Sequence, residues 1–291
     1  MVVREVARWL VLLIVSCSLY ADDAPQPRKK VLILGIDGCR PDALEKADTP
    51  AIDRLRENGA WSLSAQTGDV TVSGPGWSSM LTGVWSEKHR VRDNSFRGSK
   101  LERYPHFFRY LKRAHPDAMT ASVSHWEPIN LFITRNVDVA ASPRTDDGVA
   151  EATIRLLKNR DPDAVFVHFN DVDEAGHTKG FDPEVPEYIE AIEETDARIA
   201  RILDALEGRT DYAHEDWLIL VSTDHGGTGT KHGENSPLHR TIFLIASGPS
   251  ASRGEITPAP SIVDVAATAL THLGVEIDPD WELDGRAVGI R

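Results

Sequence analysis

The sequence is poor in cysteine, with only Cys17 and Cys39 among its 291 residues. Cys17 lies in an N-terminal segment that we expect to be removed or lipidated, which would leave Cys39 without a partner. We therefore expect no disulfide bond, even in an exported protein. Cys39 follows a predicted strand, and we interpret it as a small buried apolar residue and not as a nucleophile.

A surplus of positive charge is also missing. The chain has 32 basic residues against 45 acidic ones, and its formal net charge is −13. Nucleic acids are bound by basic surfaces, so this composition argues against a nucleic-acid-binding protein. An acidic protein can still bind phosphate locally if metal ions supply the positive charge.

A long apolar run occurs only near the N-terminus. Trp9–Val15 follows two arginines, and a polar stretch begins after Ala21. This pattern predicts a signal peptide over residues 1–21, and hence an exported protein that is periplasmic or secreted. The folded domain would then comprise residues 22–291.

Two alternatives remain for this leader. The letters "IVSC", which end at Cys17, fit a lipoprotein processing site, and Cys17 would then carry a lipid that tethers the protein. An uncleaved anchor is the other alternative, but the apolar run is short for a membrane span. Contact with a membrane is expected only through this signal or lipid. Internal repeats, low-complexity segments and linkers are absent from the sequence, so we expect a single compact domain.

Strand-like and helix-like segments alternate along the rest of the chain. The run "KKVLILGIDG" (Lys29–Gly38) predicts a fully buried parallel strand, and "MTASVSHW", "AVFVHFNDVD", "WLILVSTDHG" and "TIFLIASGP" are further strand candidates. Thr49 and Pro50 have the pattern of a helix start. The long helix of "PEYIEAIEETDARIARILDAL" places these apolar residues on one face: Tyr188, Ile192, Ile199, Leu203 and Leu206. The alternation predicts an α/β fold with a mainly parallel central sheet and helices on both faces.

Aspartate and histidine gather where the predicted strands end. In open α/β sheets, sites form beyond the carboxyl ends of the strands. A single aspartate there usually caps a helix or a turn, but three strands carrying such residues at one edge indicate a metal site. The residues concerned are Asp37, Asp173, His177, Asp224, His225 and His232.

Ser73 is the candidate nucleophile. It opens a Ser-Gly-Pro-Gly turn before the short predicted helix "GWSSMLTG". At the N-terminus of a helix, backbone N–H groups favour an anion. Ser-Gly-Pro is a common turn, however, and by itself predicts no chemistry.

These motifs together resemble the alkaline phosphatase superfamily, nearest to its type I phosphodiesterase/nucleotide pyrophosphatase branch. "VLILGIDGCRPDAL" is similar to the strand that carries the first metal aspartate, "DEAGH" to Asp-x-x-Gly-His, "STDHGG" to Asp-His-Gly, and "KHGENSP" to the segment of the last ligand histidine. The spacing of the nucleophile motif is matched by Ser73, Pro75, Thr82 and Gly83. The motifs span residues 31–288.

The resemblance implies two divalent metal ions and a serine nucleophile. One ion would be held by Asp37, Ser73, Asp224 and His225, and the other by Asp173, His177 and His232. The mixed set of ligands suits Zn²⁺, with Mn²⁺ or Mg²⁺ as alternatives. His239 is an alternative to His232. Asn94, Trp77, Trp85 and Trp126 are candidates to line the substrate pocket, and packing in the core is the alternative for each tryptophan.

The implied activity is a two-metal phosphoric ester hydrolase, a phosphodiesterase that forms a phosphoseryl intermediate on a small-molecule phosphate ester. The sequence departs from the nucleotide-specific enzymes at Ser73 and Gly76, where they have Thr and Asn, and from sulfatases at Trp77, where they have Arg. The segment "GPGWSSM" has no cation to bind the second charge of a monoester. Alternatives are a phosphomonoesterase, a sulfatase with a modified Ser73, and a catalytically silent metal-binding protein.

Overall fold

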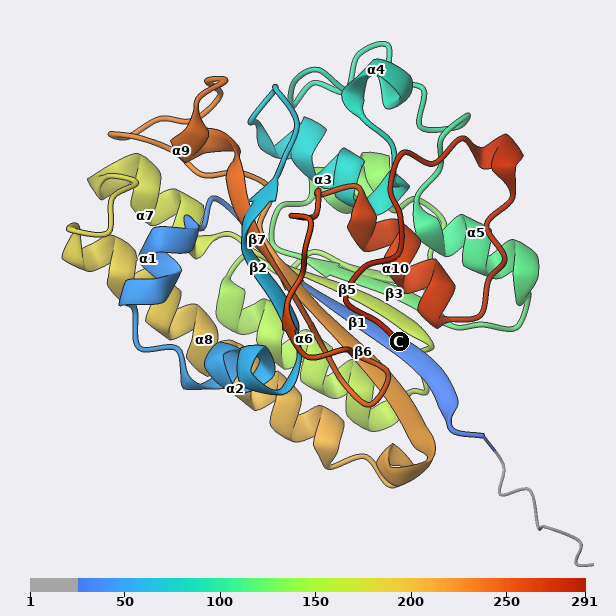
Figure 1. The fold of residues 1–291 in the computed structure, drawn as a ribbon. Helices are drawn as coiled ribbons and strands as arrows, with labels where there is room; N and C mark the ends of the chain where they lie inside the picture. The colour runs from blue at the N-terminus through green and yellow to red at the C-terminus, as the bar shows by residue number, and fades with distance from the viewer. Residues whose placement is uncertain (1–25) are drawn as a thin grey trace, which may run out of the picture.

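The computed structural model describes residues 26–291 and contains one eight-stranded sheet with helices on both faces (Figure 1). The predicted leader, residues 1–21 with Cys17, lies outside the described residues. In spatial order the strands are β4 (Val139–Ala141), β3 (Thr120–Ser124), β5 (Ala164–Phe169), β1 (Arg28–Ile36), β6 (Glu215–Ser222), β7 (Thr241–Ser247), β2 (Ala60–Gln66) and β8 (Gly254–Glu255).

The centre of the sheet is parallel. Strand β1 pairs with β5 on one side and β6 on the other, and Gly35 is in register with both His168 and Ser222. Every residue of β5 and β6 is buried, which explains their continuous apolar runs. Strand β7 runs antiparallel to β6 and to β2. The predicted fold class, a mainly parallel sheet with helices on both faces, is confirmed.

Two layers of helices cover the sheet. On one face lie α1 (Pro41–Lys46), α2 (Pro50–Asn58), α6 (Asp146–Asn159), α7 (Asp171–Lys179) and α8 (Pro186–Glu207). On the other lie α3 (Ser73–Thr82), α4 (Ser86–His89), α5 (Phe107–Ala114) and α10 (Asp264–His272). Short elements are η1 (Ile129–Ile133), η2 (Tyr212–His214), α9 (Pro237–Arg240) and η3 (Pro279–Trp281).

Successive residues of β1 belong to different cores. Leu32 and Leu34 pack with the first helical layer, whereas Val31 and Ile33 pack with the second. This alternation follows from the two-residue period of a strand and requires apolar residues at every position. The five predicted core residues of α8 are buried, as expected. Cys39 is buried and free. Within residues 26–291, no helix is both long and apolar enough to cross a membrane.

The start of α2 departs from the prediction. Thr49 precedes Pro50 as expected, but its side chain makes no capping hydrogen bond. The carboxylate of Asp196, on α8, accepts hydrogen bonds from Ala51 N (3.1 Å) and Ile52 N (2.8 Å). The helix N-terminus is therefore capped by a residue far away in the sequence, and this cap also joins α2 to α8.

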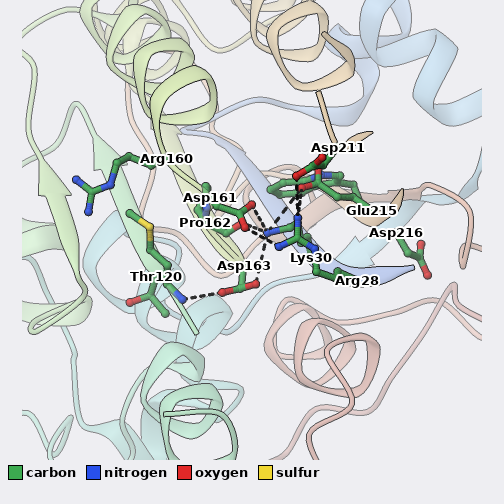
Figure 2. A network of polar contacts seen from close by, with 12 residues as sticks. Arg28, Lys30, Thr120, Arg160, Asp161, Pro162, Asp163, Asp211, Glu215 and Asp216 are labelled. Carbon is green, nitrogen blue, oxygen red and sulfur yellow. Dashed lines mark hydrogen bonds and ion pairs between the residues drawn. The ribbon is translucent and has the colours of Figure 1, made fainter. Parts of the chain in front are cut away.

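The amino edge of the sheet holds a dense ionic network (Figure 2). Lys30 is fully buried, and its Nζ donates to Asp161 Oδ1 (2.9 Å), Pro162 O (2.8 Å) and Asp163 Oδ1 (3.4 Å). Strands β1 and β5 are linked there, because Lys30 belongs to β1 and Asp161 and Asp163 precede β5.

Glu215, the first residue of β6, completes this network. Its buried carboxylate accepts from Arg209 Nε (2.9 Å), Trp217 Nε1 (2.7 Å) and Arg28 Nη2 (3.2 Å). Arg209 also reaches Asp161, at 2.7 Å. Lys30 and Glu215 therefore each have partners of opposite charge, whereas the buried carboxylate of Asp216, at the same edge, accepts only from the Ser250 hydroxyl among the described residues.

Candidate metal centre

The opposite, carboxyl edge of the sheet brings three aspartates together. Asp37 directly follows β1, Asp173 lies in the first turn of α7 after β5, and Asp224 follows β6. Two overlapping groups of ligand atoms form there, Asp37 with Asp224 and His225, and Asp173 with His225 and His232, each within 4.8 Å. The three strand ends thus converge as the sequence predicts.

These carboxylates are not neutralised by other protein groups. Asp37 Oδ1, Asp173 Oδ1 and Asp224 Oδ2 are buried and accept no hydrogen bond. Within residues 26–291, the only basic groups at ion-pair distance from the three aspartates are imidazoles. Burying anionic oxygens in this way costs several kcal/mol unless a cation compensates.

The pKa values reflect this crowding. Burial raises the pKa of Asp173 to about 9, and the nearby charge of Asp37 adds to the effect. Burial and the same neighbour raise the pKa of Asp224 well above its usual range. Burial also raises the pKa of Asp37, but the hydrogen bond from His168 and the nearby His225 outweigh it and hold that pKa well below its usual range.

The three candidate ligand histidines share one arrangement. Each Nδ1 lies at hydrogen-bond distance from a backbone carbonyl: His177 from Thr230 O (3.0 Å), His225 from Gly226 O (3.0 Å) and His232 from Thr71 O (2.9 Å). A carbonyl oxygen only accepts, so each Nδ1 carries the proton and each Nε2 keeps its lone pair. Metal-ligating histidines are held in this way.

The free Nε2 atoms face the carboxylates. His225 Nε2 lies 3.3 Å from Asp224 Oδ2 and 3.5 Å from Asp37 Oδ1. His232 Nε2 lies 3.8 Å from Asp173 Oδ1, and His177 Nε2 lies 3.4 Å from Asp173 Oδ2. Carboxylate oxygens, imidazole nitrogens and unsatisfied negative charge together fit divalent metal ions.

The geometry favours His232 over His239 as a ligand. Both ring nitrogens of His239 are already bonded, Nε2 with Thr228 Oγ1 (2.9 Å) and Nδ1 with the N–H of Glu234 (3.1 Å). His232 instead stacks on His225 at the centre, with ring centroids 3.9 Å apart.

Ser73 is the first residue of α3, with its Oγ 3.5 Å from His225 Nε2. The first turn of this helix lies against the metal centre, because a Cβ atom at Gly76 would lie 2.8 Å from Asp224 Cβ. Glycine at position 76 therefore permits this close approach. Asn94 lies in a later loop next to the first turn of α3, and its Oδ1 accepts a hydrogen bond from Gly74 N at 2.7 Å. The predicted nucleophile and one predicted substrate residue are therefore neighbours.

Trp77 differs from the expectation. Its side chain is fully buried, so it offers no surface to a substrate. Its indole Nε1 donates to Asp37 Oδ2 at 2.9 Å instead. Trp85 and Trp126 are partly buried and pack against the core on the α3 side of the sheet.

One residue in contact with the centre was not identified from the sequence. His168, in the middle of the apolar strand β5, is fully buried, and its Nε2 lies 3.0 Å from Asp37 Oδ2. A single imidazole within the run "AVFVHF" was the available signal.

A third cluster, His125 with Asp146 and Asp171, lies at the same edge. His125 Nδ1 is 2.7 Å from Asp146 Oδ1, and the Asp146 carboxylate also accepts the N–H groups of Asn170 and Asp171. Asp171 Oδ2 lies 3.3 Å from Arg198 Nη1. The carboxylates of this cluster already have partners, unlike those of the metal centre.

Two family models match the chain in succession. Residues 31–129 match the type I phosphodiesterase/nucleotide pyrophosphatase family, and residues 133–277 match the metalloenzyme superfamily. The first range includes Asp37, Ser73 and Asn94, and the second includes the ligands that follow β5 and β6.

Curated relatives are distant and longer. A phosphopentomutase of Methylobacterium is 29% identical over 51% of this chain and 34% of its own length. A 2,3-bisphosphoglycerate-independent phosphoglycerate mutase of Haloarcula marismortui is 27% identical over 44% and 24%, and human GPI ethanolamine phosphate transferase 2 is 27% identical over 50% and 15%. The chain thus spans about a third or less of these relatives.

Solved structures share the fold. A 2-O GAG sulfatase superposes with a TM-score of 0.72 at 14% identity, over 89% of this chain and 73% of that one. Murine ectonucleotide pyrophosphatase/phosphodiesterase 5, in an inactive form in complex with AMP, gives 0.70 at 15% identity, over 86% and 96%.

Proposed function

The chain belongs to the alkaline phosphatase-like superfamily, and on this premise we propose that it is a two-metal phosphoric ester hydrolase of the phosphodiesterase type. One observation carries the proposal. Three buried carboxylate oxygens without partners converge with three imidazole Nε2 atoms, next to a serine at a helix N-terminus.

The residues divide into two metal positions. Asp37, Asp224 and His225, with the Ser73 hydroxyl, form the inner position; Asp173, His177 and His232 form the outer one. Divalent ions, Zn²⁺ by the donor set, with Mn²⁺ or Mg²⁺ as alternatives, would supply the positive charge that a phosphate ester needs there. His225 lies between the two positions, since its ring stacks on His232.

Ser73 is the group that attacks. Its oxygen forms the new bond to phosphorus as the bond to the leaving alcohol breaks, and the resulting phosphoserine is then hydrolysed by water. Ser73 is the first residue of α3, and the positive end of the helix dipole favours negative charge on its oxygen. Asn94 Oδ1 is engaged by Gly74 N, which leaves the Asn94 amide N–H₂ as a neutral donor for a phosphate oxygen.

The charge of the site favours diesters. A diester carries one negative charge, whereas a monoester carries two near neutral pH. The first two turns of α3, "SGPGWSS", contain no lysine or arginine, and Asn94 adds no charge. The expected substrate is a small-molecule phosphate diester. Export, through the leader over residues 1–21 or a lipid on Cys17, is also part of the proposal and rests on the sequence pattern.

The test compares three esters on one preparation of known metal content. We expect about two equivalents of metal, and a kcat/KM for a bis-aryl phosphate at least equal to that for an aryl phosphate and well above that for an aryl sulfate. Ser73→Ala should lower kcat by at least about 10³-fold while metal content and fold are kept. A Ser73→Ala variant with normal kcat would refute the assigned nucleophile.

A sulfatase is the second candidate, because solved sulfatases share the fold and Ser73 is followed by Pro75 as in their motif. Its modified serine would be a formylglycine, which has two hydrogens fewer than serine. Mass spectrometry of the peptide containing Ser73 distinguishes the two. An unmodified serine together with poor sulfate ester hydrolysis would exclude this candidate.

A further inference from the structure

The two oxygens of the Asp37 carboxylate have opposite surroundings. Oδ2 is 2.9 Å from Trp77 Nε1 and 3.0 Å from His168 Nε2. Oδ1 is equally buried but accepts no hydrogen bond, and it lies 3.5 Å from His225 Nε2. Oδ2 thus has two hydrogen-bond donors, whereas Oδ1 has none and faces the inner metal position.

The tautomer of His168 is fixed by its neighbour. The backbone N–H of Trp126 points to His168 Nδ1 at 3.5 Å, and an N–H group can only donate. His168 Nδ1 therefore accepts, and the proton lies on Nε2, facing Asp37. This is the reverse of the ligand histidines, whose Nδ1 atoms carry the proton. His168 is accordingly a donor to Asp37 and not a metal ligand.

Both donors are held rigidly. Trp77 and His168 pack edge to face, with ring centroids 4.9 Å apart and planes at 80°. The Trp77 ring also lies over Gly35, where a Cβ atom would be only 2.6 Å from the ring, and against Phe166 at 5.7 Å. Both side chains are fully buried, so neither can turn away without opening the core.

We propose that Trp77 and His168 are positioning residues that lock the Asp37 carboxylate, so that Oδ1 alone is presented to a metal ion at the inner position. This inference rests on the proposed function, because it assumes that the position binds a divalent ion. Two N–H donors to Oδ2 remove the rotation of the carboxylate that an ion would otherwise have to restrict. They also keep the ligand anionic while it is buried.

The outer position lacks such a lock. In the described residues, the Asp173 carboxylate accepts no hydrogen bond from a donor outside the candidate ligands, and the His177 side chain is 43% exposed. The inner position should therefore bind its ion more tightly, and the two positions should fill in order, inner before outer.

The experiment measures metal binding by the full-length protein and does not depend on catalysis. Metal-free preparations of the wild type and variants are titrated with Zn²⁺ in competition with a chromophoric chelator. His168→Leu removes the donor, and His168→Gln keeps an amide N–H at the same number of bonds from the backbone. Trp77→Phe removes the second donor while retaining an aromatic ring.

The matched control is His272→Leu. His272 is equally buried, and its Nε2 lies at hydrogen-bond distance from Lys30 O (3.1 Å) and Asp216 O (2.9 Å) at the other edge of the sheet. It tests whether loss of any buried imidazole weakens metal binding through a general loss of stability. Thermal unfolding of each metal-free variant reports that stability separately.

We expect His168→Leu to weaken the tighter Zn²⁺ equivalent by about 10–100-fold and to leave the weaker one unchanged. His168→Gln should restore most of the affinity, and His272→Leu should bind as the wild type does. Trp77→Phe should weaken Zn²⁺ binding as much as His168→Leu does. If Trp77→Phe fails to fold, the comparison of His168→Leu with His168→Gln still tests the inference. Wild-type affinity in a folded His168→Leu protein would overturn the inference alone, whereas a wild type that binds no divalent metal would overturn the proposed function.

Discussion

The two edges of the central sheet treat buried charge in opposite ways. At the amino edge, the side chains of Lys30 and Glu215 are fully buried, and each meets groups of opposite charge at hydrogen-bond distance. At the carboxyl edge, Asp37, Asp173 and Asp224 crowd together with imidazoles as their only basic neighbours among the described residues. The same three strands, β1, β5 and β6, supply both edges.

The difference separates stability from function. A buried network that is complete within the chain holds neighbouring segments together and needs nothing from outside. A buried cluster with orphaned anionic oxygens is costly for the protein alone and gains stability only when a cation arrives. Three converging carboxylates without a lysine or arginine partner in residues 26–291 are therefore the feature that indicates a metal centre, and the balanced network of Lys30 and Glu215 at the amino edge is the comparison.

The largest effect is expected from removal of metal, which should act at the carboxyl edge alone. Chelation followed by gel filtration is expected to abolish ester hydrolysis, because within residues 26–291 only imidazoles lie at ion-pair distance from the three aspartates, and without metal these carboxylates would repel the phosphate. Addition of Zn²⁺ should restore the rate, and elemental analysis should show about two equivalents. Full activity in a preparation shown to be free of metal would contradict this prediction.

Substitution at the amino edge should act on stability alone. Lys30→Met removes one partner from a buried network, and we expect a loss of about 3–5 kcal/mol in the free energy of unfolding. Lys46→Met, which removes a lysine paired with Glu184 on the surface, should cost less than about 1 kcal/mol.

The control for Lys30→Met is a measurement of its metal content and its catalytic rate. Metal content and kcat of the folded fraction should equal those of the wild type, because the substitution lies at the opposite edge from Ser73. Loss of metal in this variant would show that the two edges do not act independently.

Metal-free protein should lose stability as the pH rises. The pKa of Asp173 is raised to about 9 by burial, so the folded state holds a proton that the unfolded state releases at a much lower pH. Stability contributed by this proton is lost as the pH rises toward 9. The raised pKa of Asp224 should likewise make the metal-free protein less stable as the pH rises.

In a window of about pH 7 to 9 the histidines whose pKa burial lowers, such as His225, are neutral in both states. The hydrogen bond with Asp146 raises the pKa of His125, so Asp173→Asn is needed to separate the contribution of Asp173 from that of His125. The melting temperature of the metal-free wild type should fall across this window, and Asp173→Asn should flatten the slope. Zn²⁺-loaded protein should show little dependence. A metal-free melting temperature that rises from pH 7 to 9 would be the opposite of what we expect.

The smallest effect is expected at Asn94. Asn94→Ala removes one neutral donor and should lower kcat/KM by about tenfold to a hundredfold, with metal content unchanged. Asn94→Asp keeps the shape but adds negative charge, so it should be worse than alanine for a monoester. Equal rates for Asn94→Ala and the wild type would place the phosphate elsewhere.

Much of this site could be predicted from the sequence, because its ligands follow buried strands directly. Asp37, Asp224 and His225 sit where an apolar run ends, and such runs fix both the strand and its carboxyl end. Parallel pairing of β1 with β5 and with β6 then brings these ends together, although β1 is separated from the other two strands by more than a hundred residues.

The supporting residues could not be predicted in this way. The side chain of His168 lies on the α3 side of the sheet. The sequence does not reveal this orientation, because the other residues of β5 are apolar on both faces and show no alternation. The residues next to Trp77 in the sequence do not distinguish a tryptophan that lines a pocket from one that packs in the core. The cap on α2 comes from Asp196, a contact set by packing of α8, and short edge strands such as β8 have no apolar run to mark them.

Strand β1 also determines how the molecule faces its surroundings. It begins at Arg28 and ends next to Asp37, and nine steps of about 3.3 Å place the chain's point of entry about 30 Å from the metal centre. Any attachment through the segment before Arg28, to a bead, a surface or a bilayer, therefore joins the folded domain at the edge of the sheet opposite the metal centre.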